Sequence, residues 1–301
     1  MPQVDIDVER QHAARLALLD PLLPADPPLT GELIATLGAL GAPVSIEIDP
    51  DSLIATWGAL RRHTLTVRLA GADLDPLLDR WEEQLAGLAA PGDDDCVAMI
   101  TFPSRDTAAV PALIRHGFAP LIVTAVRRAG VGGPGPSVPD VTIRHATKAD
   151  LVACVALNVE VVRYDTQFGA LTERPSTEAG LRQHTSDLLD REQPCIWLAE
   201  VAGRPVGIVT VDLPPHSDWM AGRTSASPVA YLGLGGVRAD LRGGGIGSAL
   251  VAHVHRELDE AGIAATLLHY ALPNPRSAPF WSVQGYRPLW TSWHRRPALR
   301  T

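Results

Sequence analysis

The chain has 301 residues, of which 46% are hydrophobic and 20% charged, and its formal net charge is −8. This composition allows large cores and argues against global disorder, and the acidic balance argues against unspecific nucleic-acid binding. The N-terminus lacks the pattern of a signal peptide, and no uncharged apolar run approaches the roughly 18 residues of a membrane span. Three widely spaced cysteines match no metal site and indicate buried thiols in a reducing compartment. We therefore expect a cytoplasmic protein with no membrane segment, no nucleic-acid partner and no metal.

The first half alternates between helical and strand patterns. Helices are expected at 8–19, 30–40, 73–88 and 107–116, and strands at 44–48, 65–69, 96–102 and 121–127. The clearest is 73–88, where leucines and a tryptophan recur at three- and four-residue spacing. The helix at 30–40 is expected because Gly41 provides a stop.

Residues 129–140 are almost entirely glycine, proline and small side chains, which predicts an interdomain linker. In the second half, strands are expected at 141–144, 196–201, 206–213, 231–237, 265–270 and 287–293, and helices at 148–161, 177–190, 250–258 and 275–283. Residues 164–175 and 214–228 are expected to be loops. The sequence thus predicts an α/β (α+β) protein with domains at 1–128 and 141–301.

The most informative stretch is 242–247, Arg-Gly-Gly-Gly-Ile-Gly, between a predicted strand and a predicted helix. Glycine permits positive φ and lets a ligand reach the backbone, and the first amides of a helix have no intrahelical partner. With the helix dipole, these features make an anion site suited to a phosphate or pyrophosphate. A structural strand–helix turn is the alternative. The stretch is neither a P-loop, because no Lys-Ser/Thr follows, nor a dinucleotide fingerprint, because the βαβ context is missing.

The element order and two motifs resemble the GCN5-related N-acetyltransferases (GNAT). The family motif Gln/Arg-x-x-Gly-x-Gly/Ala corresponds to Arg242, Gly245 and Gly247. The family's later motif, Asn-x-x-Ala-x-x-Phe-Tyr followed by Gly-Phe/Tyr-Arg-Pro, corresponds to residues 274–281 and 285–288, except that Trp281 replaces the tyrosine. The resemblance covers about 141–293. It implies, in each GNAT-like half, a mostly antiparallel mixed sheet flanked by helices.

The resemblance implies acetyl-CoA, or another acyl-CoA, as the cofactor. Its pyrophosphate is expected on the turn, and its pantetheine arm beside the preceding strand, where a bulge at Gly235-Gly236 would open a slot. Asn274 would bind the pantetheine, with helix capping as an alternative or additional role. The implied cofactor residues are Leu234, Gly235, Val237, Arg242, Gly243, Gly244, Gly245, Ile246, Gly247, Ser248, Asn274 and Phe280.

The catalytic residues are less clearly indicated. The family attacks the thioester directly with a neutral amine, and the Val237 amide would polarise the thioester carbonyl. Trp281 stands where the family often has an acid tyrosine, and an indole cannot transfer a proton at neutral pH, which puts the usual acid in doubt. The catalytic candidates are therefore His269 and Tyr231, together with Trp281 at the position of the family tyrosine, and His216 is a weaker one.

The first half resembles the second in element order, but at the place of the glycine turn it has only residues 69–73, with one glycine and an acid. It is interpreted as a degenerate GNAT-like domain without a cofactor site. The leading hypothesis is an N-acetyltransferase, monomeric or homodimeric, that acts on a small-molecule or peptide amine. A non-catalytic acyl-CoA sensor or scaffold, and a CoA-thioester enzyme with a non-amine acceptor, remain as alternatives.

Overall fold

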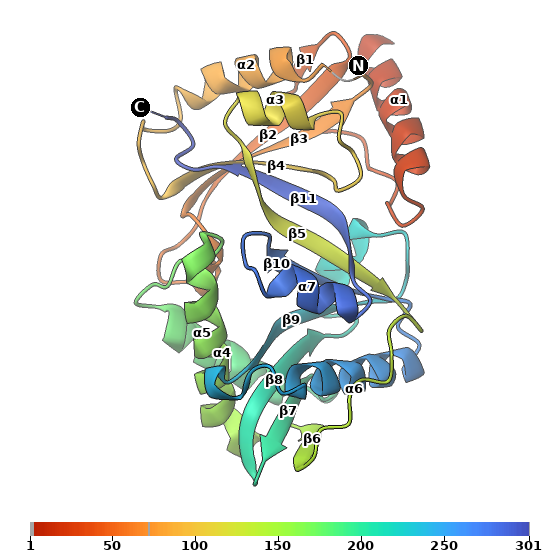
Figure 1. The fold of residues 1–301 in the computed structure, drawn as a ribbon. Helices are drawn as coiled ribbons and strands as arrows, with labels where there is room; N and C mark the ends of the chain where they lie inside the picture. The colour runs from red at the N-terminus through yellow and green to blue at the C-terminus, as the bar shows by residue number, and fades with distance from the viewer. Residues whose placement is uncertain (1–2, 72, 301) are drawn as a thin grey trace. The chain divides into compact units, whose positions relative to one another are not determined.

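The computed structural model describes residues 3–71 and 73–300 and divides the chain into two compact units. Unit 1 comprises Met1–Pro50, Gly58–Thr124 and Pro288–Thr301, and unit 2 comprises Asp51–Trp57 and Ala125–Arg287 (Figure 1). The C-terminal strand therefore belongs to unit 1, although it follows the second half in sequence. Its register explains this: Trp290 to Arg295 pair antiparallel with Pro103 to Ala98.

The strands of unit 1 have the order β1-β2-β3-β4-β11-β5. They are β1 (Ile34–Thr36), β2 (Ala39–Glu47), β3 (Arg61–Leu69), β4 (Cys96–Pro103), β11 (Arg287–Arg295) and β5 (Ala119–Arg128), and β5 runs on into unit 2. The pairing of β3 with β4 is parallel, and the pairings β1–β2, β2–β3 and β4–β11 are antiparallel. The helices are α1 (Gln3–Leu19), α2 (Asp75–Leu85) and α3 (Val110–Arg115).

The expected helix at 30–40 is wrong, because this stretch forms β1 and the start of β2 around a turn at Gly38. Residues 39–42 are all buried, so the alternation that identifies a half-buried strand is missing. Both faces of β2 are covered: Ala39 joins the core beneath α2 and α3, whereas Leu40 and Ala42 pack with Val8 of α1. A strand that is buried on two sides has no periodicity by which to recognise it.

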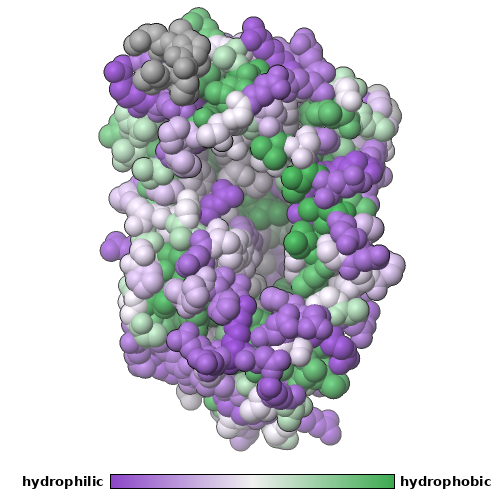
Figure 2. Space-filling view, turned by 180° about the vertical axis from the view of Figure 1, so that it is seen from behind, coloured by the Kyte–Doolittle hydropathy of each residue, from purple (hydrophilic) through white to green (hydrophobic). Residues whose placement is uncertain are grey.

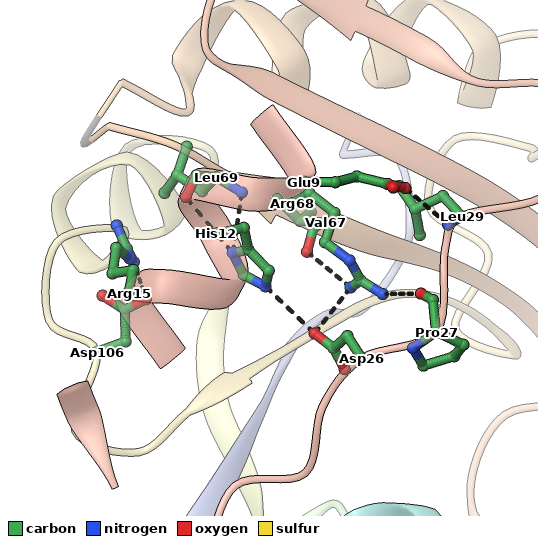
Figure 3. Close-up of polar contacts among 10 residues, drawn as sticks. All are labelled: Glu9, His12, Arg15, Asp26, Pro27, Leu29, Val67, Arg68, Leu69 and Asp106. Carbon is green, nitrogen blue, oxygen red and sulfur yellow. Dashed lines mark hydrogen bonds and ion pairs between the residues drawn. The ribbon is translucent and has the colours of Figure 1, made fainter. Parts of the chain in front are cut away.

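Polar contacts fix α1 to the end of β3 (Figure 3). The His12 ring accepts a hydrogen bond from the Leu69 amide at 3.2 Å, and its other nitrogen lies 3.3 Å from Asp26. Arg15 donates to the Gly71 carbonyl at 2.9 Å and forms an ion pair with the buried Asp106. Arg15 thereby connects the segments that follow β3 and β4.

Unit 2 contains strands in the order β10-β9-β8-β7-β6. They are β6 (Val141–His145), β7 (Ile196–Val201), β8 (Arg204–Asp212), β9 (Val229–Val237) and β10 (Ala265–Ala271). Only the β9–β10 pairing is parallel. Helices α4 (Leu151–Asp165) and α5 (Thr177–Leu189) pack with β7 and β8 on one face. On the other face, Trp197 donates a hydrogen bond to Glu257 of α6 (Ile246–Glu260), and α7 (Ser277–Val283) precedes β11. The expected mixed, mostly antiparallel sheets with flanking helices are confirmed.

The glycine- and proline-rich segment 129–140, predicted as a linker, falls within unit 2 and is exposed apart from the half-buried Val138, but it crosses α6 at close range. Arg127, just before it, forms two hydrogen bonds of 2.8 and 2.7 Å with Asp259 of α6. A Cβ on Gly135 would lie only 2.5 Å from the Cβ of Ala252, so this glycine allows the chain to cross α6 at close range. We call residues 129–138 the strap.

All three cysteines are free and buried, as predicted. Within the described residues, no helix is long and apolar enough to cross a membrane, and no cluster of three or more side chains could hold a metal. The face in Figure 2 shows hydrophobic residues in separate patches among hydrophilic ones.

Candidate active site

The sheet of unit 2 opens where β9 and β10 separate. They pair in parallel from Val229 opposite Ala265 to Leu232 opposite Leu268, and the pairing ends there. On the other edge of β9, the register with β8 shifts between Val209 and Val211. Gly233 and Leu234 of β9 both lie opposite the single residue Thr210 of β8. The bulge therefore lies two residues before the predicted Gly235-Gly236.

The Thr210 side chain explains the position of the bulge. Its hydroxyl accepts a hydrogen bond from the Leu234 amide at 2.8 Å. A Cβ on Gly233 would lie 2.9 Å from the same oxygen, too close for any other residue without a shift. The bulge therefore depends on a threonine in one strand and a glycine in the next. Its consequence is that the second half of β9 turns away from β10.

The glycine turn follows β9 after the short 3₁₀ helix η5 (Ala239–Leu241) and leads into α6. Gly243 and Gly245 have φ of +84° and +85°, the left-handed conformation that favours glycine. The amides of Ile246, Gly247 and Ser248 open the helix and have no acceptor among the described residues. These three free donors lie at the positive end of the helix dipole, where the sequence predicts an anion site.

Arg242 is held back against the protein. Its Nε donates to the Val237 carbonyl at 2.8 Å, and its guanidinium lies 3.2 Å from Glu160 and 4.8 Å from the centre of the Tyr164 ring. Arg276 lies over the same ring at 5.5 Å. Glu160 and Tyr164 both come from α4, and neither is among the residues that sequence reasoning identified.

Asn274 is buried, and both ends of its amide are engaged. Its nitrogen donates to Asp165 at 2.9 Å, and its oxygen accepts from the Arg276 amide at 3.0 Å just before α7. The second bond closes a turn before the helix and is not the helix cap considered as an alternative role, because α7 begins with Arg276 as its N-cap residue and has no side-chain cap. Burial raises the pKa of Asp165, despite the opposing hydrogen bond from Asn274. Asp165 was expected in a loop but is the last residue of α4.

Phe280 and Trp281 of α7 lie at different parts of the site. A Cβ on Gly247 would come within 3.5 Å of the Phe280 ring, and one on Gly235 within 3.6 Å of Trp281. Phe280 therefore stands at the start of α6, whereas Trp281 is buried beside the second half of β9. The Ser248 hydroxyl accepts a hydrogen bond from Gln284 at 3.1 Å.

Tyr231 and His269, both predicted candidates, are brought together by the structure. The Tyr231 hydroxyl lies 3.0 Å from Nδ1 of His269, and His269 is the first residue of β10 beyond the paired region. His269 is exposed, but many protein atoms surround its imidazole ring. This desolvation, aided by the charge of Arg223, lowers the pKa of His269 to about 4. Burial, with the nearby Asp212 carboxylate, raises the pKa of Tyr231.

Three other histidines of unit 2 have different surroundings. His216 is exposed, His253 lies 2.8 Å from Glu257 of its own helix, and His255 is buried against the Tyr286 hydroxyl. Cys154 and Cys195 are not nucleophiles, because burial raises the pKa of Cys195 and raises that of Cys154 to about 12. Trp219, which contacts Tyr231, was not predicted as a site residue, and nothing in the polar sequence around it indicated its position.

Comparison with known proteins agrees with this geometry. The model of the family described as "Acetyltransferase (GNAT) family" matches residues 164–286. The chain is similar to a GCN5-related N-acetyltransferase from Sphaerobacter thermophilus, with 17% identity over 99% of this chain and 96% of that one and a TM-score of 0.60. It is also similar to a GNAT-family acetyltransferase from Colwellia psychrerythraea, with 11% identity over 96% of both chains and a TM-score of 0.53.

At such identities, the two structures show the fold, here over nearly the whole chain, and the family match covers the glycine turn and the motif that begins at Asn274. A search of curated proteins gave no match. The resemblance predicted from the motifs is thereby confirmed. The chain therefore contains a domain of the GNAT acetyltransferase family at residues 164–286.

Proposed function

We propose that unit 2 transfers an acetyl group from acetyl-CoA to an amine of a small molecule or peptide. The observation that carries this proposal is the juxtaposition of two features along one strand. β9 separates from β10 after Leu232, and five residues later it leads into a turn whose amides are free to bind an anion. An extended thioester with a pyrophosphate at one end matches that arrangement.

The residues present fit coenzyme A. The amides of 243–248 would hold the pyrophosphate, and Leu234, Gly235 and Val237 would run beside the pantetheine arm, with the Val237 amide near the thioester carbonyl. Phe280 at the turn and Asn274 beside α7 complete the set. The Asn274 amide is already hydrogen-bonded to Asp165 and Arg276. We therefore propose that it shapes this side of the site as well as contacting the cofactor. When bound, the cofactor supplies the acyl group and a thiolate leaving group.

The Tyr231–His269 pair can manage both protons of the reaction. If Nδ1 of His269 carries its proton and donates to the tyrosine oxygen, Nε2 is left as an acceptor for the amine proton. In that tautomer the hydroxyl hydrogen of Tyr231 is free to be donated to the departing thiolate. With a pKa of about 4, His269 is neutral at pH 7, so its Nε2 is unprotonated when the amine attacks. We propose His269 as base and Tyr231 as acid.

This assignment replaces the tyrosine that the family motif leads one to expect at position 281. Trp281 is 8% exposed and makes edge contacts with Phe280 and Tyr286. An indole is a hydrogen-bond donor but no acid at neutral pH. We therefore propose that Trp281 packs beside the second half of β9 and takes no part in proton transfer.

We further propose that unit 1 is a degenerate copy and that each chain has one active site. As in unit 2, a parallel strand pair ends early, at Leu65 opposite Ile100. No glycine-rich turn follows β3, and residue 72 of that segment lies outside the described residues. Instead, Arg15 donates a hydrogen bond to the Gly71 carbonyl. It also pairs with Asp106 beyond β4 (Figure 3). A guanidinium that spans the two strand ends in this way stands where a ligand would have to enter.

Two measurements test the proposed function. Calorimetric titration with acetyl-CoA should give one site per chain, and a two-site isotherm would contradict the assignment of unit 1. Release of free thiol from acetyl-CoA should then depend on added amine. Tight binding of acetyl-CoA without amine-dependent thiol release would favour a non-catalytic acyl-CoA sensor. The absence of the family's acid tyrosine, which Trp281 replaces, is compatible with such a role.

A further inference from the structure

The short 3₁₀ helix η4 (Asp218–Arg223) holds one tryptophan outward from a well-anchored base. The Ser217 hydroxyl donates to the Val229 carbonyl at 2.8 Å, and Met220 is only 1% exposed. Between them Trp219 is 57% exposed. An exposed indole on a tethered segment has a defined position. Its apolar surface is removed from water only when something binds to it.

Trp219 stands over the two residues proposed to transfer protons. Its ring lies 4.7 Å from that of Tyr231 at an edge-on angle of 64°, and 6.5 Å from that of His269 at 25°. Tyr231 and His269 are themselves 5.5 Å apart. Three rings from η4, β9 and β10 therefore form one aromatic wall, which we define as Trp219, Tyr231 and His269.

The charges around the wall do not favour a polycation. Asp212, opposite Tyr231 in the register of β8 and β9, forms an ion pair with Arg191 at 2.8 Å. The helix η4 itself carries one acid, Asp218, and one base, Arg223, and the charge of Arg223 is felt at the His269 ring. His184 of α5 also lies near Asp212 and Arg191, and burial lowers its pKa, so it adds no positive charge at neutral pH.

Building on the proposed transferase function, we propose that the aromatic wall selects the acceptor. The acceptor class is a monoamine whose amino group is carried on an aromatic ring or a similarly flat apolar body. Trp219 is its specificity-determining residue. Offset or edge-on packing of such a body against Trp219 would leave its amino group beside His269. The thioester carbon forms a C–N bond with this amine as its C–S bond breaks, the amine proton goes to His269, and Tyr231 protonates the thiolate.

The test compares 2-phenylethylamine with cyclohexylamine, spermidine and kanamycin as acceptors in the thiol-release assay. We expect the highest kcat/KM for 2-phenylethylamine. Trp219→Ala should raise the KM for this amine by about tenfold, the loss expected for one aromatic contact, with a smaller change in kcat. Trp219→Phe should restore most of it. Val152→Ala, which truncates an exposed side chain of α4, serves as the control.

Acetyl-CoA affinity should be unchanged in the Trp219 variants, which separates the acceptor side from the cofactor side. Preference of the wild type for spermidine or kanamycin, or an unchanged KM in Trp219→Ala, would overturn the inference. If no amine releases thiol, titration of 2-phenylethylamine into the CoA-saturated protein still decides. Weaker binding to Trp219→Ala than to wild type would keep the aromatic wall and refute only the transfer chemistry, whereas equal or absent binding would refute the wall.

Discussion

Substitution of a single turn glycine offers the sharpest test of the cofactor site. Gly245→Val is an obvious choice, but a Cβ there would lie 3.3 Å from Val138 and 3.4 Å from Pro136 of the segment that crosses α6. Any loss of binding would then be confounded with a disturbed segment. Gly243 is better, because it has φ of +84° and a Cβ added to it would have no atom within 4 Å.

Gly262, just beyond the other end of α6, is a matched control with φ of +79° and the same open surroundings. Valine in the left-handed conformation costs about 1–2 kcal/mol of stability at either position. Only position 243 lies in the turn that is proposed to hold the pyrophosphate. Loss of one charge-assisted hydrogen bond, about 1.5–3 kcal/mol, corresponds to roughly 10- to 150-fold weaker binding.

Calorimetric titration with acetyl-CoA, together with thermal unfolding of each variant, measures both quantities. We expect Gly243→Val and Gly262→Val to unfold at similar temperatures, and only Gly243→Val to lose affinity. Wild-type affinity in a folded Gly243→Val protein would refute the placement of the pyrophosphate on this turn. Equal loss of affinity in both variants would show that the effect comes from α6 as a whole.

Three further predictions follow from individual contacts. At a fixed concentration of neutral amine, kcat/KM should fall only near pH 4, where His269 becomes protonated. The contribution of this histidine to stability should decline as pH drops from about 6.5 toward 4, because the unfolded chain takes up the proton first. In chemical denaturation, Gly135→Ala should lose about 1–3 kcal/mol more unfolding free energy than Gly130→Ala. The two glycines have similar φ of +78° and +74°, but only a Cβ at 135 would meet α6, at 2.5 Å, whereas one at 130 faces open space. Arg15→Ala should cost about 2–3 kcal/mol by leaving a buried carboxylate unpaired, while Arg10→Ala, on the exposed part of the same helix, should change stability little.

Each of these has an outcome that would contradict it. An acid limb near pH 6.5 would show that the His269 ring is not desolvated or is not the base. Equal stability of the two glycine variants would mean that the strap does not pack on α6. If Arg15→Ala were as stable as Arg10→Ala, the ion pair with Asp106 would contribute nothing to holding α1.

The sequence predicted most elements because their apolar residues recur with a single period. The helix at 73–88 and the strand at 96–102 were found with small shifts of their ends, as α2 and β4. The failure at 30–40 has a physical cause, since a strand covered on both faces is apolar without alternation, and such a run is compatible with either structure. The bulge was expected from paired glycines, but Thr210 on the neighbouring strand determined which residues form it.

The prediction of function was likewise divided between features that are local in the chain and features that depend on tertiary structure. The glycine turn and the motif from Asn274 to Pro288 are local: backbone conformation, helix-end amides and short spacings produce them, so the sequence alone indicated the family and its cofactor. Other features join residues that are distant in the chain: the contact of Tyr231 with His269, the contact of Trp219 with Tyr231, the ion pair of Arg15 with Asp106 and the pairing of β11 with β4. Contacts of that kind depend on strand register and on which side chain a neighbouring element buries, and these are decided only when the sheet has formed.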